Sequence, residues 1–288
     1  MRAHIKMPTG PGEAQIPSSK RNYVILAGCL ACLIFCCVTL FTLNRSRESA
    51  ALEHAFWIVG HASYAAPQRQ EAFLQLIAAG NREWRGAQVA ALHFDGVAFP
   101  QVFLKEIDFT GGSFCRSVFA RAQLGGAKLA NTDLSDSDFS EGDLAGANLF
   151  KAQLARAHFR QASLRGAVLE QVAASNAVFL GAELGEAQCL MGNFSGANFT
   201  SANLTGASLE AAVLRGANLT FALMVGVDLK DADLTDANWW RARQLTSSQI
   251  NWLAKRFPPS RNAPKGWQDD FAEWQTVYQK AIGVEPEK

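Results

Sequence analysis

The sequence predicts a mainly β protein in which a β-solenoid lies between helical end segments and follows one transmembrane helix. Three observations predict this arrangement. An apolar residue recurs at every fifth position from Phe94 to Trp239, a segment of 21 residues near the N-terminus carries no charge, and helical apolar patterns flank the repeats. The expected segments are a tail (1–22), a transmembrane helix (23–43), a helical linker and N-terminal cap (44–86), a β-helix (87–240) and a helical C-terminal cap (241–288).

The uncharged segment runs from Tyr23 to Leu43, and basic residues stand on both sides of it. At about 1.5 Å per residue, a helix of this length spans a hydrocarbon core of about 30 Å. A cleavable signal peptide has an apolar stretch of about 7 to 15 residues that ends at small residues, and this segment shows neither feature. We therefore expect a transmembrane helix.

The motif Leu26-Ala27-Gly28-Cys29 within this segment resembles a bacterial lipobox. The chain stays apolar beyond it, whereas a lipid-anchored chain has no need of a full-length span. We interpret the four cysteines of the segment as small apolar residues, because thiolates and metal charge are costly in hydrocarbon. Three of them share one helix face that permits self-association, namely Cys29, Cys32 and Cys36.

The positive residues around this segment predict its orientation. Arg2, Lys6, Lys20 and Arg21 precede it, whereas Arg45 and Arg47 closely follow it. This excess favours a cytoplasmic N-terminal tail. We expect a single pass through a bacterial inner membrane, with the body of the protein on the periplasmic side.

The linker between this helix and the repeats has a helical pattern from Glu48 to Gly80, broken at Pro67. Four residues form its apolar stripe, namely Phe73, Leu74, Leu76 and Ile77. Gly80 and Asn81 follow as a C-terminal stop signal. We expect this segment to cover the first coil of the solenoid.

The period of five fits neither a helix nor a continuous strand. Thirty consecutive centres from Phe94 to Trp239 are apolar, and most have a small residue two positions earlier, such as Ala127 before Leu129. Two residues that are two positions apart on one face indicate a strand, and the other residues of each unit must then turn the chain. Repeated turning in one direction produces a β-solenoid whose coils stack on one another.

These units resemble those of the pentapeptide-repeat proteins, whose pattern is alanine, aspartate or asparagine, leucine and two further residues. Matching units include Ala147-Asn148-Leu149, Ala202-Asn203-Leu204 and Ala232-Asp233-Leu234. The resemblance covers roughly residues 87–240. It implies a right-handed quadrilateral β-helix with four units per coil.

Residues twenty apart provide an independent check, because four units of five would place them on the same face. One such column is purely phenylalanine and is a predicted structural ladder, formed by Phe99, Phe119, Phe139, Phe159, Phe179 and Phe199. A leucine column begins at Leu104 and continues to Leu204. Thirty units correspond to about 7.5 coils, and the expected number is therefore 7 to 8, with a length of about 36 Å. Side chains fill the interior and leave no ligand cavity.

The residues after Trp239 predict two cap helices. Thr246 or Ser247 is the expected N-cap of the first helix, which carries Ile250, Trp252 and Leu253 and ends at Pro258-Pro259. The second helix is expected near residues 268–282. Its apolar residues are Phe271, Trp274, Val277 and Tyr278.

One group of apolar residues points outward from the last coils. Phe221, Leu223 and Val225 lie together at a corner and its adjoining strand. The C-terminal helices pack over them in one interpretation, and a partner protein binds them in the other.

The sequence offers no recognisable catalytic or metal-binding constellation. Its five histidines form no close pair, and outside the uncharged segment it has only Cys115 and Cys189. The acidic run from Asp133 to Asp143 resembles a calcium loop, but the repeat register continues through it. We therefore expect no enzyme activity, no cofactor and no bound metal.

Three functions remain open at this level. The first is a non-enzymatic, membrane-tethered scaffold or adaptor that binds a protein through its rigid walls. The second follows from the family resemblance, since some soluble members mimic DNA and protect type II topoisomerases, but the acidic columns that this needs are diluted here. The third is a secretion-related accessory or delivered effector. The net charge of +1 gives no reason to expect nucleic acid as a partner, and the partner protein and oligomeric state stay undetermined.

Overall fold

The structure is a computed structural model that describes residues 48–61, 63–80, 84, 87, 89–99 and 101–281. The chain divides into two compact units, Met1–His54 and Ala55–Lys288. The described part of the first unit is the start of a helix over residues 48–60. The predicted transmembrane helix at Tyr23–Leu43 lies outside the described residues, and no helix within them is long and apolar enough to cross a membrane.

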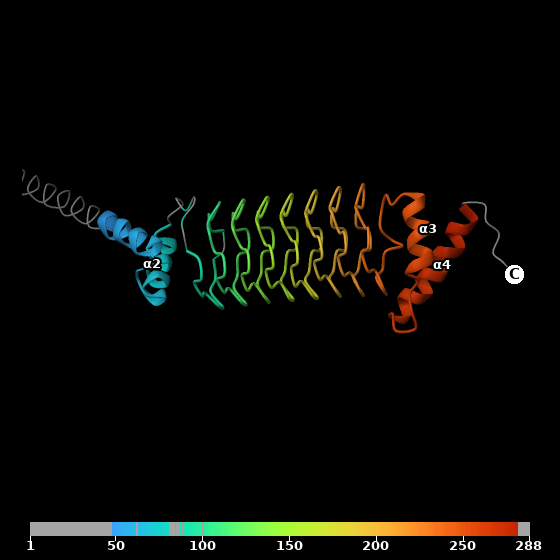
Figure 1. Cartoon of the computed structure of the whole chain (residues 1–288), viewed down its shortest axis with the longest axis horizontal. Helices are drawn as coiled ribbons and strands as arrows, with labels where there is room; N and C mark the ends of the chain where they lie inside the picture. The colour runs from blue at the N-terminus through green and yellow to red at the C-terminus, as the bar shows by residue number, and fades with distance from the viewer. Residues whose placement is uncertain are drawn as a thin grey trace, which may run out of the picture. The chain divides into compact units, whose positions relative to one another are not determined.

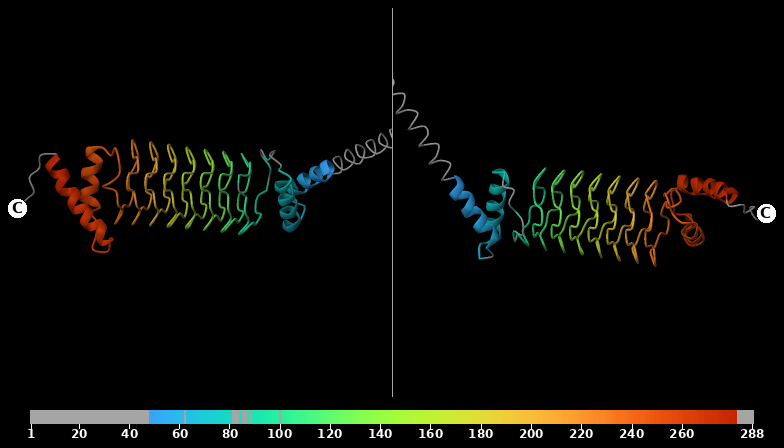
Figure 2. Two further views of the ribbon diagram at one scale, coloured as in Figure 1. Left: turned by 180° about the vertical axis from the view of Figure 1, so that it is seen from behind. Right: turned by 90° about the horizontal axis from the view of Figure 1, so that it is seen from above.

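The repeats of the second unit form a β-helix of coils stacked along one axis (Figure 1). Every isolated bridge in the described residues is parallel and joins residues twenty apart, from His93 with Ser113 to Leu223 with Arg243. The predicted four-unit coil is thereby confirmed. Seen from behind and from above, the coils keep the same stacking direction (Figure 2).

The unit around Leu124 shows how five residues make one side of a coil. Ala122 and Leu124 are buried inside, and Gln123 between them pairs with both neighbouring coils. The chain then turns at Gly126, whose φ is 68°, and the Ala127 amide donates to the Leu124 carbonyl over 2.9 Å. A four-residue turn whose third residue has positive φ follows the type II pattern.

At each corner one residue has a positive φ, in the left-handed region, and such residues recur at every fifth position from Ala91 to Asp236. Glycine adopts this conformation without cost, but many corners hold other residues, including Arg116 at 58°, Lys151 at 57° and Phe221 at 59°. The asparagine or aspartate of the repeat supports the turn. Asn198 Oδ1, for example, accepts hydrogen bonds from the Thr200 amide at 3.0 Å and its hydroxyl at 2.6 Å.

The phenylalanine column forms a continuous stack inside the β-helix. Between Phe119 and Phe199 the neighbouring ring centroids are 4.8 to 5.1 Å apart, and their planes differ by no more than 4°. This spacing is close to the distance of about 4.8 Å between paired strands. The ladder is therefore a direct result of placing identical side chains on successive coils.

In the described residues, two helical segments precede the first coil. The helix over residues 48–60 is followed by α2, Ala66–Ala78. Residues 61 and 63–65 are not helical, so the predicted break at Pro67 is wrong by a few positions. Pro67 lies in the first turn of α2, where its missing amide hydrogen costs nothing. From α2, Phe73 packs against Phe94 at 5.0 Å and Phe109 at 5.8 Å between ring centroids, and so covers the first coil.

The helices α3, Ser247–Arg256, and α4, Lys265–Ala281, cover the last coil (Figure 1). Thr246 is the N-cap of α3, as predicted, and its side chain accepts from the Gln249 amide. The indole of Trp239 donates to the Phe257 carbonyl at 2.9 Å. Val277 was expected on the packed face of α4, but it is 62% exposed because the aromatic contacts of α4 are made by Phe271 and Trp274 instead.

Candidate functional site

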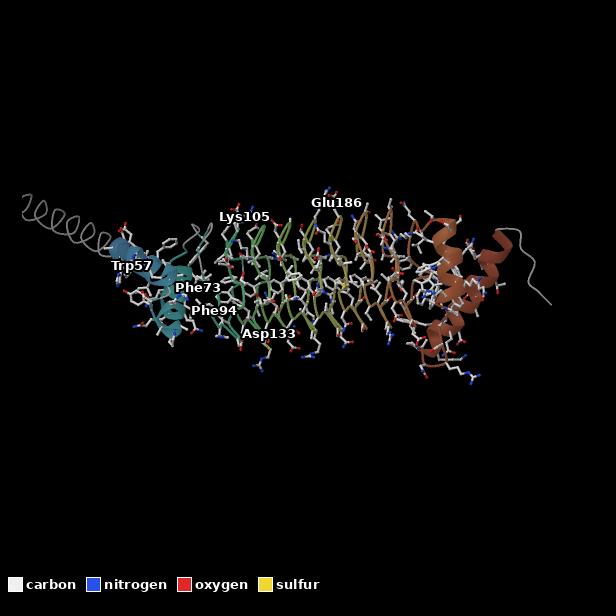
Figure 3. All side chains as sticks on the ribbon, in the orientation of Figure 1. Trp57, Phe73, Phe94, Lys105, Asp133 and Glu186 are labelled. Atoms are coloured by element: carbon white, nitrogen blue, oxygen red, sulfur yellow. The ribbon has the colours of Figure 1, made fainter. Side chains whose placement is uncertain are left out.

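The surface available for function consists of the outward strand positions, the corners and the helical caps. The interior is filled by the inward side chains, of which Leu144, Phe159 and Leu204 have no exposed surface. Figure 3 shows charged residues such as Lys105 and Glu186 at the corners of the coils. Any binding by the described β-helix therefore takes place on its walls or at its ends.

Ion pairs between successive coils neutralise much of the charge on these walls. Within the part of the chain that the structure describes, six such pairs are formed by Arg121 with Glu141, Arg156 with Asp136, Lys230 with Glu210, Arg215 with Asp233, Arg165 with Glu186 and Lys128 with Asp108. The hydrogen bond from Arg156 lowers the pKa of the Asp136 carboxyl. Exposed pairs of this kind contribute little stability, but they prevent a continuous acidic stripe along the rod.

The acidic run that resembles a calcium loop is dispersed by the fold. Asp133, Asp138 and Asp143 occupy outward positions on three different sides, and each uses its Oδ1 to accept an amide hydrogen bond two residues later. Asp136 and Glu141 lie at corners and pair with arginines. Across the described residues, no group of three histidine, cysteine or acidic side chains is placed to hold a metal ion.

The two cysteines of the β-helix lie in different environments. Cys189 is buried in an inward column, and burial raises the pKa of its thiol to about 12. Cys115 is partly exposed at a corner, and desolvation followed by the charge of Asp133 raises its thiol pKa. Neither environment favours the thiolate that nucleophilic chemistry requires.

The predicted outward patch of Phe221, Leu223 and Val225 lies near the C-terminal end of the β-helix. Phe221 is 49% exposed and Val225 is 38% exposed. The Arg243 guanidinium lies 5.3 Å from the centre of the Phe221 ring, and Arg243 belongs to the strand position next to Leu223 rather than to a cap helix. The exposure of Phe221 and Val225 does not fit the interpretation in which the C-terminal helices pack over the patch.

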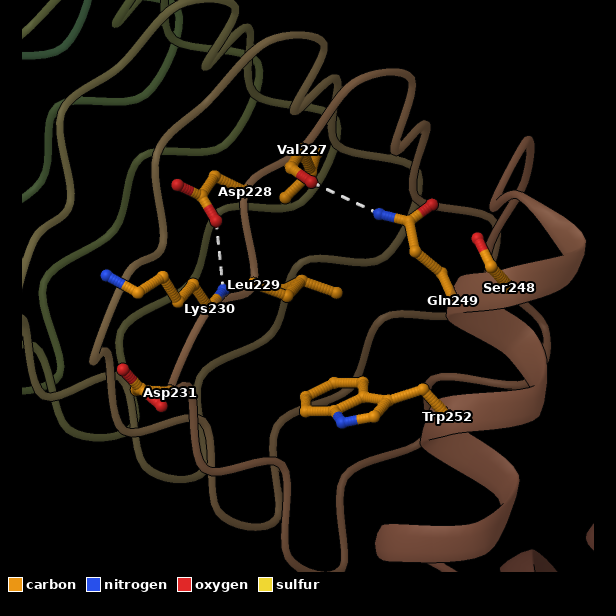
Figure 4. Close-up of a pocket in the computed structure, with 8 residues that line it drawn as sticks. All are labelled: Val227, Asp228, Leu229, Lys230, Asp231, Ser248, Gln249 and Trp252. Carbon is orange, nitrogen blue, oxygen red and sulfur yellow. Dashed lines mark hydrogen bonds between the residues drawn. The ribbon is translucent and has the colours of Figure 1, made fainter.

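An open groove of about 430 Å³ lies after this patch along the chain, between the end of the β-helix and α3 (Figure 4). Residues 227–231 form one wall, and Ser248, Gln249 and Trp252 form the other. Gln249 Nε2 donates to the Val227 carbonyl at 3.2 Å and so joins α3 to the coil. Val225 stands only two residues before this wall, so the patch and the groove follow one another around a corner.

A second open groove, of about 390 Å³, lies at the N-terminal cap. It is lined by Ile58 and Tyr64 on one side and by residues of α2 between Pro67 and Gln75 on the other. Its walls are mainly apolar and carry one acidic residue, Glu71. It offers shape without a convergent set of polar groups.

The groove beside α3 is not evident from the sequence. The apolar pattern of the cap helix predicts Trp252 on the same side as Ile250 and Leu253, yet Trp252 is 38% exposed while Leu253 is fully buried. A usable signal was present, because Ile250, Leu253 and Phe257 follow the three- and four-residue spacing of one helix face. Trp252 falls beside that face.

Comparison with known families finds one matching description. Residues 117–152, 152–187 and 193–231 match a family model described as pentapeptide repeats, with eight copies. These ranges cover less than half of the chain, and the model describes a repeat rather than a catalytic domain. A search of curated proteins finds no match.

Several solved structures are similar to this chain. HetL, a pentapeptide-repeat protein involved in the regulation of heterocyst differentiation in the cyanobacterium Nostoc sp. strain PCC 7120, is 22% identical, and the match covers 58% of this chain and 95% of HetL at a TM-score of 0.33. A trypsin-treated variant of QnrB1, a plasmid-mediated fluoroquinolone resistance protein, is 16% identical, with 69% and 100% covered and a TM-score of 0.31. A thylakoid-lumen pentapeptide-repeat protein from Arabidopsis thaliana is 27% identical, with 49% and 88% covered and a TM-score of 0.20.

Proposed function

We propose, from the pentapeptide repeats that the family model matches between residues 117 and 231, that this chain is a non-enzymatic, membrane-tethered scaffold or adaptor. These repeats imply a right-handed β-helix. Its rigid walls present a fixed surface to a protein partner. The tether is the apolar segment Tyr23–Leu43, which is proposed on its length and lack of charge.

One observation carries the scaffold proposal. Phe221 and Val225 remain exposed on a wall whose other outward positions are mainly polar or charged. The backbone beneath them is fixed, since the Phe221 amide donates to the Arg241 carbonyl at 3.0 Å and the Leu223 amide to the Ala202 carbonyl at 2.9 Å. Grouped apolar side chains on a rigid, water-facing surface favour contact with another protein.

Site-specific photo-crosslinking in intact membranes tests this proposal. A photoreactive amino acid placed at Leu223 is expected to capture a partner protein. Ser163 provides the matched control, because it occupies the same outward column three coils earlier. Capture of the same proteins at both positions, or capture of nothing at Leu223, would contradict a partner surface at the patch.

The membrane tether has a separate test. A periplasmic reporter fused after residue 288 is expected to be active, and deletion of residues 23–43 is expected to release the protein from the membrane fraction. A fusion that is active only in the cytoplasm would reverse the proposed orientation. Both results are independent of whether the patch binds a partner.

The topoisomerase and secretion alternatives lack a specific supporting observation. DNA mimicry requires continuous negative charge, whereas Glu141, Asp136 and Glu210 are all paired with basic residues from adjacent coils. A DNA gyrase supercoiling assay with and without a fluoroquinolone tests the first alternative. Protection of the enzyme by the full chain would favour it over the scaffold.

A further inference from the structure

The groove beside α3 has a preorganised aromatic wall. Trp252 projects from α3 toward the coil that carries Leu229 (Figure 4). Its ring packs edge-on against Phe257, with centroids 5.5 Å apart and an interplanar angle of 76°. Phe257 is buried and its amide donates to the Leu253 carbonyl at 2.8 Å. The indole is therefore held by packing while part of its surface stays accessible to a ligand.

The opposite wall of the groove carries more negative than positive charge. Asp228 and Asp231 are both exposed there, and Lys230 is the basic residue between them. Lys230 Nζ binds Glu210 Oε1 of the preceding coil at 2.5 Å, so its charge is already matched by a carboxylate outside the groove. Two carboxylates thus face the site, and Lys230, which is paired with Glu210, also attracts both of them.

An aromatic face and exposed carboxylates together complement a planar cation. A guanidinium group stacks on an indole face and at the same time donates paired hydrogen bonds to a carboxylate, which an ammonium group cannot do with the same geometry. The apolar patch of Phe221, Leu223 and Val225 lies directly before the groove along the chain. A ligand that reaches both surfaces needs apolar side chains next to the cation.

We infer that this groove docks an arginine of the partner protein, in a segment whose neighbouring apolar residues lie over the Phe221 patch. The inference rests on the proposed scaffold function and specifies the chemistry of its partner. The arginine stacks on Trp252 and pairs with Asp231, and Asp228 adds negative potential to the site. Because these charges are near the surface, the interaction weakens as salt concentration rises.

A binding assay with defined peptides tests the inference. The probe is a fluorescein-labelled hexapeptide with two leucines followed by an arginine, and its matched control contains citrulline, which is neutral and nearly isosteric, at the arginine position. Full-length protein in detergent micelles is titrated into each peptide, and fluorescence anisotropy is recorded. The arginine peptide is expected to bind about 5-fold or more tightly than the citrulline peptide, as the strength of cation–π and carboxylate contacts implies.

Variants of the groove identify where the peptide binds. Trp252→Ala and Asp231→Asn are each expected to weaken binding of the arginine peptide about 3- to 10-fold, and neither is expected to change binding of the citrulline peptide as much. Glu170→Gln is the control, because it removes a carboxylate from the same edge of the β-helix three coils away. Circular dichroism of each variant confirms that its fold is retained.

Three outcomes would overturn the inference. The first is equal affinity of the protein for the two peptides, and the second is unchanged peptide affinity in both groove variants. The third is peptide binding that is seen only when sedimentation shows dimers of the protein, which would assign the groove to a second copy of the chain. A partner captured at Leu223 despite any of these results would leave the scaffold function intact. Failure of the inference and failure of the proposed function are thereby distinguished.

Discussion

Replacing Phe139 with alanine tests the claim that stacked columns hold the β-helix together. The side chain is fully buried, and its ring lies 5.0 Å from Phe119 and 5.1 Å from Phe159. Large-to-small substitutions of buried phenylalanine cost about 3 to 5 kcal/mol. The upper part of this range is expected, because hydrogen bonds to both neighbouring coils prevent the backbone from closing the cavity. The Phe139 amide, for example, donates to the His158 carbonyl at 2.7 Å.

Amide hydrogen exchange is the appropriate assay, because a stacked repeat unfolds through interactions between neighbours and need not be two-state. The substitution is expected to accelerate exchange of the coils over residues 119–159 by about two to nearly four orders of magnitude, at about 1.4 kcal/mol per factor of ten. Phe139→Leu conserves most of the volume and is expected to cost less than about 1.5 kcal/mol. Phe221→Ala, at an exposed corner, is expected to change exchange very little. A loss below about 1 kcal/mol for Phe139→Ala, or equal acceleration in every coil, would refute the reasoning.

Three further predictions concern single side chains. Maleimide is expected to modify Cys115 but not Cys189 in the folded protein, because the Cys189 thiol is buried with its pKa raised to about 12. Peptide mass mapping before and after denaturation measures the modification of each cysteine. Modification of Cys189 at the rate of Cys115 would contradict the prediction. The hydrogen bond from Arg241 lowers the pKa of the Asp270 carboxyl in the folded protein. The stability that this pair gives the folded state is therefore present above the pKa of aspartate in the unfolded chain, about 3.9, and is lost as pH falls through the folded pKa. Asp270→Asn is therefore expected to lower the melting temperature of the C-terminal cap at pH 7, and by progressively less as the pH is lowered, measured by tryptophan fluorescence. An equal loss at every pH would exclude this role. Asn198→Ala is expected to cost about 1 kcal/mol by removing two turn hydrogen bonds, whereas Asn198→Asp keeps the acceptor; equal exchange rates in the two variants would show that the turn does not depend on it.

The inward half of each repeat was predictable, because one physical requirement determines it. Leu129 and Ala127 must point to the same interior, and the next centre must return to that interior after five residues, which only a strand followed by a corner achieves. The column of phenylalanines at twenty-residue intervals then indicated the number of units in a coil. The structure shows both features, in the buried pairs of each unit and in bridges that join residues twenty apart.

The corners and the groove were less accessible to such reasoning. The left-handed position is occupied by Gly126 in one unit but by Lys151 or Phe221 in others, so residue type alone does not reveal it. The hydrogen bonds between coils impose this conformation, and they are formed by residues nineteen to twenty-one positions apart. The groove depends on how α3 meets the last coil, which is decided by a contact as specific as that of Gln249 with the Val227 carbonyl.

Because the step between coils is constant, the length of the β-helix changes in fixed increments when coils are added or removed. Each added set of twenty residues would move the Phe221 patch away from the N-terminal cap by about 4.8 Å without rotating it to another side, whereas an addition of five would carry it around by a quarter of a turn. Changes in reach and changes in direction are therefore separable in this architecture. By gaining or losing whole coils, a β-helix of this kind can change the distance between its two caps while each wall keeps its direction.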